Sequence, residues 1–161
     1  MKLAEALLLR ADRKRAFEQL RGRAQAVSRF QEGEEPPEDA NTLLARADEV
    51  LTEFEVLVRD INRTNSTTSL TDGRTLTAAL AERDVLRIRY ALLSNVADAA
   101  SGQSAGPQPH FAVRQMRSEL KFVTAVPVAE VRERANGVAR RHRELDAQIQ
   151  QVNWTTDLIE E

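Results

Sequence analysis

Two heptad runs of mainly apolar residues constrain the fold of this chain more than any other feature of its sequence. Alternating spacings of three and four residues keep one face of an α-helix against a partner helix. The first run is Leu44, Ala47, Leu51, Phe54, Val58 and Ile61, and the second is Ala135, Val138, His142, Leu145, Ile149 and Val152. Each run therefore needs another helix to cover it, within the chain or in a second copy.

Periodicity and helix breakers predict four long helices, at residues 2–31, 38–62, 75–100 and 127–152. Gly33, Pro36 and Pro37 interrupt the helical pattern, and Pro127 suits the first turn of the last helix. At ~1.5 Å per residue the helices are roughly 35–45 Å long. We predict an all-α bundle of two antiparallel helical hairpins.

The segment 111–126 fits two patterns. Its apolar residues alternate as in a strand, yet they also fit a helical stripe. Because β-branched residues cluster near its end and Pro127 disfavours a helical Val126, we predict a short extended arm or β-hairpin.

The second and third helices carry apolar residues on more than one face. The second repeats the pairs Leu43/Leu44, Val50/Leu51 and Leu57/Val58, and the third has a second stripe of Val85, Ile88, Leu92 and Val96. We predict that both helices are buried on more than one face. This surplus predicts a homo-oligomer formed through the helix seams and the 111–126 arm.

Length and composition indicate one helical domain, 1–161, because 161 residues with 42% hydrophobic content can form one core. A shift of 91 positions aligns the two heptad runs, which predicts an internal duplication of 1–70 and 71–161. The alternative is that any two heptad helices can be slid into register. Ser, Gly and Pro at 101–110 predict a flexible surface loop.

The overall charge and residue content argue against several classes of function. The net charge of −2, from 23 basic and 25 acidic residues, creates no general attraction to nucleic acid or anionic lipid. The chain has no cysteine and two histidines, so we expect no metal site and no cofactor. The apolar stretch near Leu7 is too short for a signal peptide or a membrane span, so we expect a cytoplasmic protein without membrane contact.

Both heptad runs end on an apolar-Asn-X-Thr sequence. If the two helix ends converge, their amides, hydroxyls and guanidinium groups would form a pocket for a small polar or phosphorylated ligand. The candidate ligand-binding residues are Asn62, Arg63, Thr64, Asn65, Arg74, Asn153, Trp154 and Thr155. Helix capping explains the Asn and Thr residues without a ligand. We also expect the Trp154 ring to pack against the bundle end or a neighbouring subunit.

No nucleophile elbow or phosphate-binding loop is present, so we assign no catalytic residue. The arginines of 132–143 could touch phosphates, but interleaved glutamates favour a solvated, ion-paired face. The leading hypothesis is a homo-oligomeric assembly or interaction protein without catalysis. The alternative is a ligand-binding or enzymatic bundle, and the third is a nucleic-acid accessory protein.

Several blocks of this sequence resemble the septicolysin-like family of small bacterial proteins of largely unknown function. The blocks are Met1–Leu7, Asp60–Asn65, Leu76–Asp84, Glu119–Val123, Glu144–Asp146 and Asn153–Thr156. They spread from end to end of the chain. The resemblance implies a mostly helical, cytosolic protein and supplies no catalytic residues.

Overall fold

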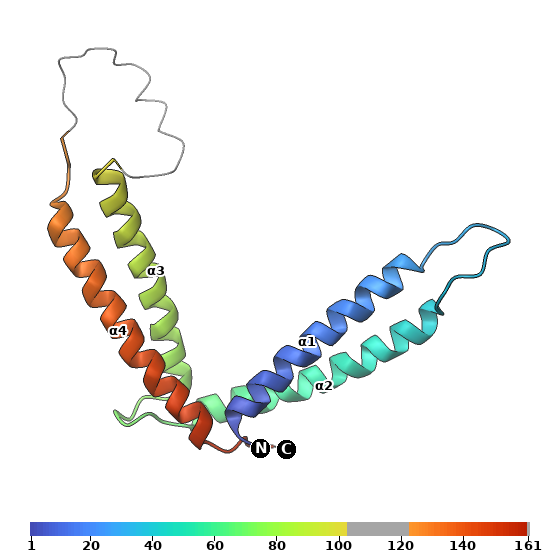
Figure 1. Ribbon diagram of the computed structural model, residues 1–161. Coiled ribbons are helices and arrows are strands. Elements are labelled where there is room, and N and C mark those ends of the chain that lie inside the picture. The colour runs from blue at the N-terminus through green and yellow to red at the C-terminus, as the bar shows by residue number, and fades with distance from the viewer. Residues whose placement is uncertain (103–122, 161) are drawn as a thin grey trace, which may run out of the picture. The chain divides into compact units, whose positions relative to one another are not determined.

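The protein is all-α. Its computed structural model describes residues 1–102 and 123–160 and contains four long helices in them (Figure 1). They are α1 (Leu3–Ala26), α2 (Ala40–Thr67), α3 (Leu76–Ala100) and α4 (Val128–Thr155). Helix α1 packs along α2, and α3 packs along α4, so the predicted pair of helical hairpins is confirmed. None of the described helices is long and apolar enough to cross a membrane.

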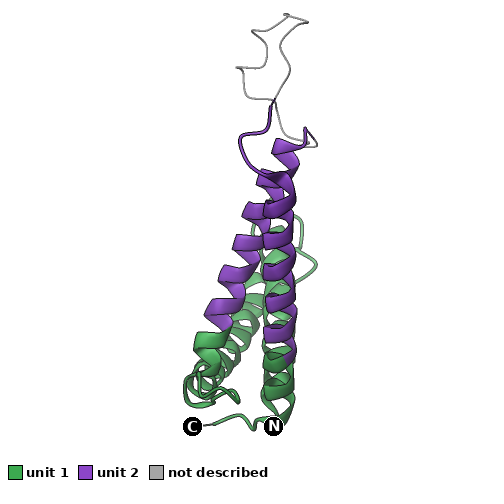
Figure 2. Cartoon of the chain, turned by 90° about the vertical axis from the view of Figure 1, so that its left-hand side faces the viewer, with its two compact units in different colours: residues 1–79, 148–161 green, residues 80–147 purple. Residues whose placement is uncertain are grey.

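The chain divides into two compact units, which Figure 2 colours separately. Unit 1 comprises Met1–Ala79 and Gln148–Glu161, and it contains the α1·α2 hairpin together with the end of α4 and the C-terminal tail. Unit 2 is Leu80–Ala147 and contains most of α3 and α4. The internal duplication stays a prediction.

A glycine turn and polar contacts shape the connection between α1 and α2. Gly33 has φ 91°, a left-handed conformation that glycine adopts without steric cost. Asp39 then caps α2, because its carboxylate accepts hydrogen bonds from the backbone N–H groups of Asn41 and Thr42. Arg23 near the end of α1 forms an ion pair with Glu38. The predicted break between the first two helices is confirmed, but α1 ends at Ala26, five residues earlier than the predicted end at residue 31.

Helix α2 ends at Thr67, five residues later than its sequence pattern predicts. We expected the polar residues after Ile61 to leave the helix, because their side chains compete for backbone groups. Instead, the hydroxyls of Ser66 and Thr67 donate back to the Arg63 carbonyl at 2.8 and 3.0 Å. The chain then turns at Asp72-Gly73, with Gly73 at φ 83°.

Unit 2 has an alanine-rich core between its two helices. Leu93 and Ala97 of α3 form a buried cluster with Val131 and Ala135 of α4. Three ion pairs join the same helices along their length: Arg83–Asp146 at 3.4 Å, Arg141–Glu82 at 3.2 Å and Arg132–Asp98 at 3.6 Å. Small core side chains let helices approach closely, and long charged ones pair across the edges.

The predicted arm at 111–126 is described only in its last four residues. Residues 123–126 are neither helix nor strand, and residues 111–122 lie outside the described residues. Of the predicted loop at 101–110, Ser101 and Gly102 are described, and the rest lies outside the described residues.

Candidate functional site

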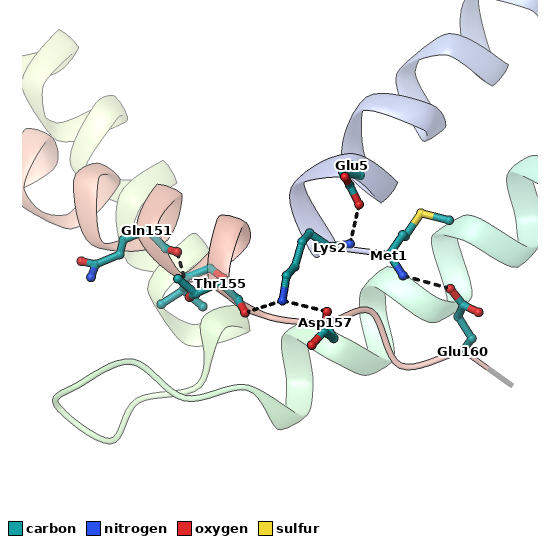
Figure 3. Close-up of polar contacts among 8 residues, drawn as sticks. Met1, Lys2, Glu5, Gln151, Thr155, Asp157 and Glu160 are labelled. Carbon is teal, nitrogen blue, oxygen red and sulfur yellow. Dashed lines mark hydrogen bonds and ion pairs between the residues drawn. The ribbon is translucent and has the colours of Figure 1, made fainter.

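The two chain termini of unit 1 are fastened to each other beside the end of α4. The Leu3 N–H donates to the Thr156 carbonyl at 3.0 Å, and the Leu158 N–H donates to the Met1 carbonyl at 2.9 Å. Between these bonds, Lys2 and Asp157 form an antiparallel bridge. We call this set of contacts the terminal clasp, and the N- and C-terminal residues meet in it (Figure 3).

Side chains reinforce the terminal clasp. The Lys2 ammonium lies 2.8 Å from the Asp157 carboxylate and donates to the Thr155 carbonyl at 3.1 Å (Figure 3). The hydrogen bond from the Lys2 ammonium to the Asp157 carboxylate, together with its positive charge, holds the pKa of Asp157 below its usual range. The Met1 ammonium pairs with Glu160 at 3.7 Å. These groups are partly exposed to water, so each ion pair adds little stability by itself.

A buried threonine connects the first Asn-X-Thr sequence to the tail that follows the second. Thr64 is fully buried, and its hydroxyl donates to the Asp60 carbonyl at 2.8 Å. The same oxygen accepts a hydrogen bond of 2.9 Å from the Ile159 N–H. Thr64 thus binds its own helix and the C-terminal tail with one hydroxyl group.

All eight predicted ligand-binding residues belong to unit 1, but they differ in accessibility. Thr64 and Asn153 are buried; Arg63, Asn65 and Arg74 are half-buried; Asn62, Trp154 and Thr155 are exposed. Several already have structural partners: Arg74 pairs with Asp72 at 2.6 Å, and the Thr155 hydroxyl donates to the Gln151 carbonyl at 2.9 Å. Ligand binding by these residues stays a prediction.

Trp154 does not anchor the end of the hairpin. Its side chain is 57% exposed, although it directly follows a covered heptad run. The expectation of an intramolecular anchor is therefore wrong, because at this end of α4 the buried side chain is that of Asn153. The alternative, a contact of Trp154 with a neighbouring subunit, stays a prediction.

Sequence reasoning missed the terminal clasp and the role of Thr64. Neither has a periodic signal, since both join the first or second helix to residues near the end of the chain.

His142 is half-buried in α4. Within the parts of the chain that the structure describes, no group of three or more histidine or acidic side chains is placed to hold a metal ion.

One face of α3 carries a heptad run that nothing in the described chain covers. It consists of Ala81, Val85, Ile88, Leu92, Asn95 and Ala99, which we call the α3 seam, and all six are exposed. Val85, Ile88 and Leu92 are 50%, 66% and 61% exposed, whereas Leu93 and Ala97, which pack with α4, are buried. Burial of α3 on two faces is therefore wrong for a single chain: α4 covers one face, and the predicted second stripe is left open.

Helix α2 shows the same imbalance to a smaller degree. Of its paired apolar rows, Leu43 and Leu57 are buried, but Leu44 and Leu51 are exposed. Leu44 borders an apolar groove of about 320 Å³ that also contacts Phe17 of α1. Burial of both rows of α2 within one chain is therefore not observed.

Comparisons with other proteins identify the family of the chain. A solved structure from Corynebacterium diphtheriae, described as a functionally unknown conserved protein, is 37% identical over 99% of both chains, with a TM-score of 0.87. A search among curated proteins finds no match. The matches do not carry the septicolysin name, so that resemblance stays a prediction. Residues 10–158 match the model of a family of unknown function, DUF6847, and the chain belongs to this family.

Proposed function

We propose that this protein is a homo-oligomeric assembly protein that associates through the α3 seam. The observation that carries the proposal is the exposure of Val85, Ile88 and Leu92 on one heptad face. Exposed apolar side chains are common singly, but a heptad row of them is typical of a helix that meets another helix. The small net charge of −2 adds little repulsion between copies.

Substitution within the seam tests this proposal. We expect the double variant Ile88→Gln/Leu92→Gln to keep its helicity and to dissociate, because both side chains point away from the α3·α4 core. Val56→Gln is the control, since Val56 is also an exposed aliphatic residue on a helix, α2, at 41% exposure. Size-exclusion chromatography with light scattering reports the mass. Equal masses for the wild type and the double variant would contradict the proposal.

A further inference from the structure

We infer that two copies of α3 pair in parallel and in register, with Asp84 of each copy facing Arg89 of the other. This inference rests on the proposed assembly through the α3 seam and specifies its geometry. The occupant of the seam is a second copy of this chain, and the order of charges beside the seam selects its direction.

The seam has the spacing of a two-stranded coiled coil. Its members follow one another at intervals of four, three, four, three and four residues, and they cover about 27 Å of helix at ~1.5 Å per residue. Val85, Leu92 and Ala99 occupy the a positions of the heptads, and Ile88 with Asn95 occupies d positions. No charged side chain stands on this face.

Charges at the flanks distinguish a parallel pair from an antiparallel one. In a parallel coiled coil, a g residue faces the e residue five positions later on its partner. Asp84 occupies g and Arg89 occupies e, so parallel pairing creates two opposite-charge contacts by symmetry. Arg89 makes no ion pair with another described residue, and the Asp84 contact with Arg83, at 3.5 Å, is exposed and weak.

Antiparallel pairing would set like charges against each other. In that arrangement e positions face e positions and g positions face g positions. Arg89 would then lie near Arg89 of the other copy at the symmetry axis, and Asp84 would lie opposite Asp98 of the other copy. Like charges across a helix interface disfavour that alignment. Asn95 adds a second preference, because the two Asn95 amides can hydrogen-bond to each other in the parallel pair, whereas the antiparallel pair would set each of them against an apolar side chain.

The absence of native cysteine permits a direct test of direction in the full-length protein. In a parallel, in-register pair each seam residue meets its own copy. We therefore expect both single variants, Ala81→Cys and Ala99→Cys, to form disulfide-linked dimers by themselves in a glutathione redox buffer. Arg87→Cys, on the same helix but away from the seam, is the control and should stay largely reduced.

The outcomes separate this inference from the proposed function. A disulfide that forms only when Ala81→Cys and Ala99→Cys proteins are mixed would show antiparallel pairing and overturn the inference while leaving the assembly intact. An oligomer that gives no disulfide in any of these samples would also overturn it. A protein that is monomeric by light scattering would overturn both.

Charge exchange provides an independent readout. Asp84→Arg replaces two attractive contacts by two repulsive ones, so we expect it to weaken dimerisation about tenfold. The double variant Asp84→Arg/Arg89→Asp should restore the dimer to near its original affinity. Loss without restoration would contradict the parallel geometry.

Discussion

Thr64 shows how one hydroxyl can hold two distant parts of a chain. Its buried hydroxyl donates to a carbonyl of its own helix and accepts a hydrogen bond from the Ile159 N–H of the C-terminal tail. We expect Thr64→Val to destabilise unit 1 by about 1–3 kcal/mol, since it preserves the side-chain shape but removes two hydrogen bonds of a buried hydroxyl, each contributing about 0.5–1.5 kcal/mol.

Thr155 is the matched control, because it occupies the corresponding position of the second Asn-X-Thr sequence and also donates to the carbonyl four residues earlier. It is exposed, so Thr155→Val should change the unfolding free energy by about 0.5 kcal/mol or less. Urea unfolding followed by circular dichroism measures both variants. Equal losses for Thr64→Val and Thr155→Val would show that the bond to Ile159 contributes nothing.

Trp154 is the single tryptophan and reports its own exposure. Because 57% of its side chain is accessible, native emission should lie close to that of free indole, and iodide should quench it efficiently. Trp154→Ala should change the unfolding free energy by about 0.5 kcal/mol or less. Blue-shifted, poorly quenched emission in the oligomer would instead place the ring in a subunit contact.

At the scale of elements, the four helices could be predicted from the sequence, but which of their faces pack against another helix could not. All four follow from periodicity and from breakers such as Pro127, because these signals are local, although α1 ends at Ala26, well before Gly33. The end of α2 was misplaced, since whether a threonine hydroxyl bonds back into its own helix depends on its neighbours. The α3 stripe was recognised as apolar, but the sequence could not show that α4 would leave it open.

The candidate site could be predicted only in part from the sequence. The two Asn-X-Thr sequences do belong to one compact unit, and Thr64 is joined to the tail beyond the second of them. The terminal clasp that surrounds this contact was not predicted. Its members, such as Lys2 and Asp157, lie 155 positions apart in the chain, and no local pattern marks such a pairing.

The terminal clasp should make unit 1 sensitive to acid. Lys2 lowers the pKa of Asp157 in the folded state. The Lys2–Asp157 ion pair therefore contributes fully to the free energy of unfolding above the unfolded-state pKa of ~4. It is lost as the pH falls through the lower folded-state value. We expect Asp157→Asn to reduce the unfolding free energy at pH 7 slightly and to flatten its decline below about pH 4. Parallel pH profiles for wild type and variant would refute this role.

At the scale of the whole molecule, the α3 seam gives a moderate driving force for association. Full burial of a Val, Leu or Ile side chain contributes about 1.5–3 kcal/mol, and these side chains are already partly covered. Association itself costs at least ~4 kcal/mol in lost freedom. The net gain is therefore small, and we expect a weak dimer with a dissociation constant in the high micromolar range, not populated at nanomolar concentration.

Sedimentation equilibrium of the wild-type chain across nanomolar to high micromolar concentrations tests the assembly most directly. We expect a mass that rises from 18.1 kDa toward twice that value within the micromolar range. A mass of 18.1 kDa at every concentration would contradict it.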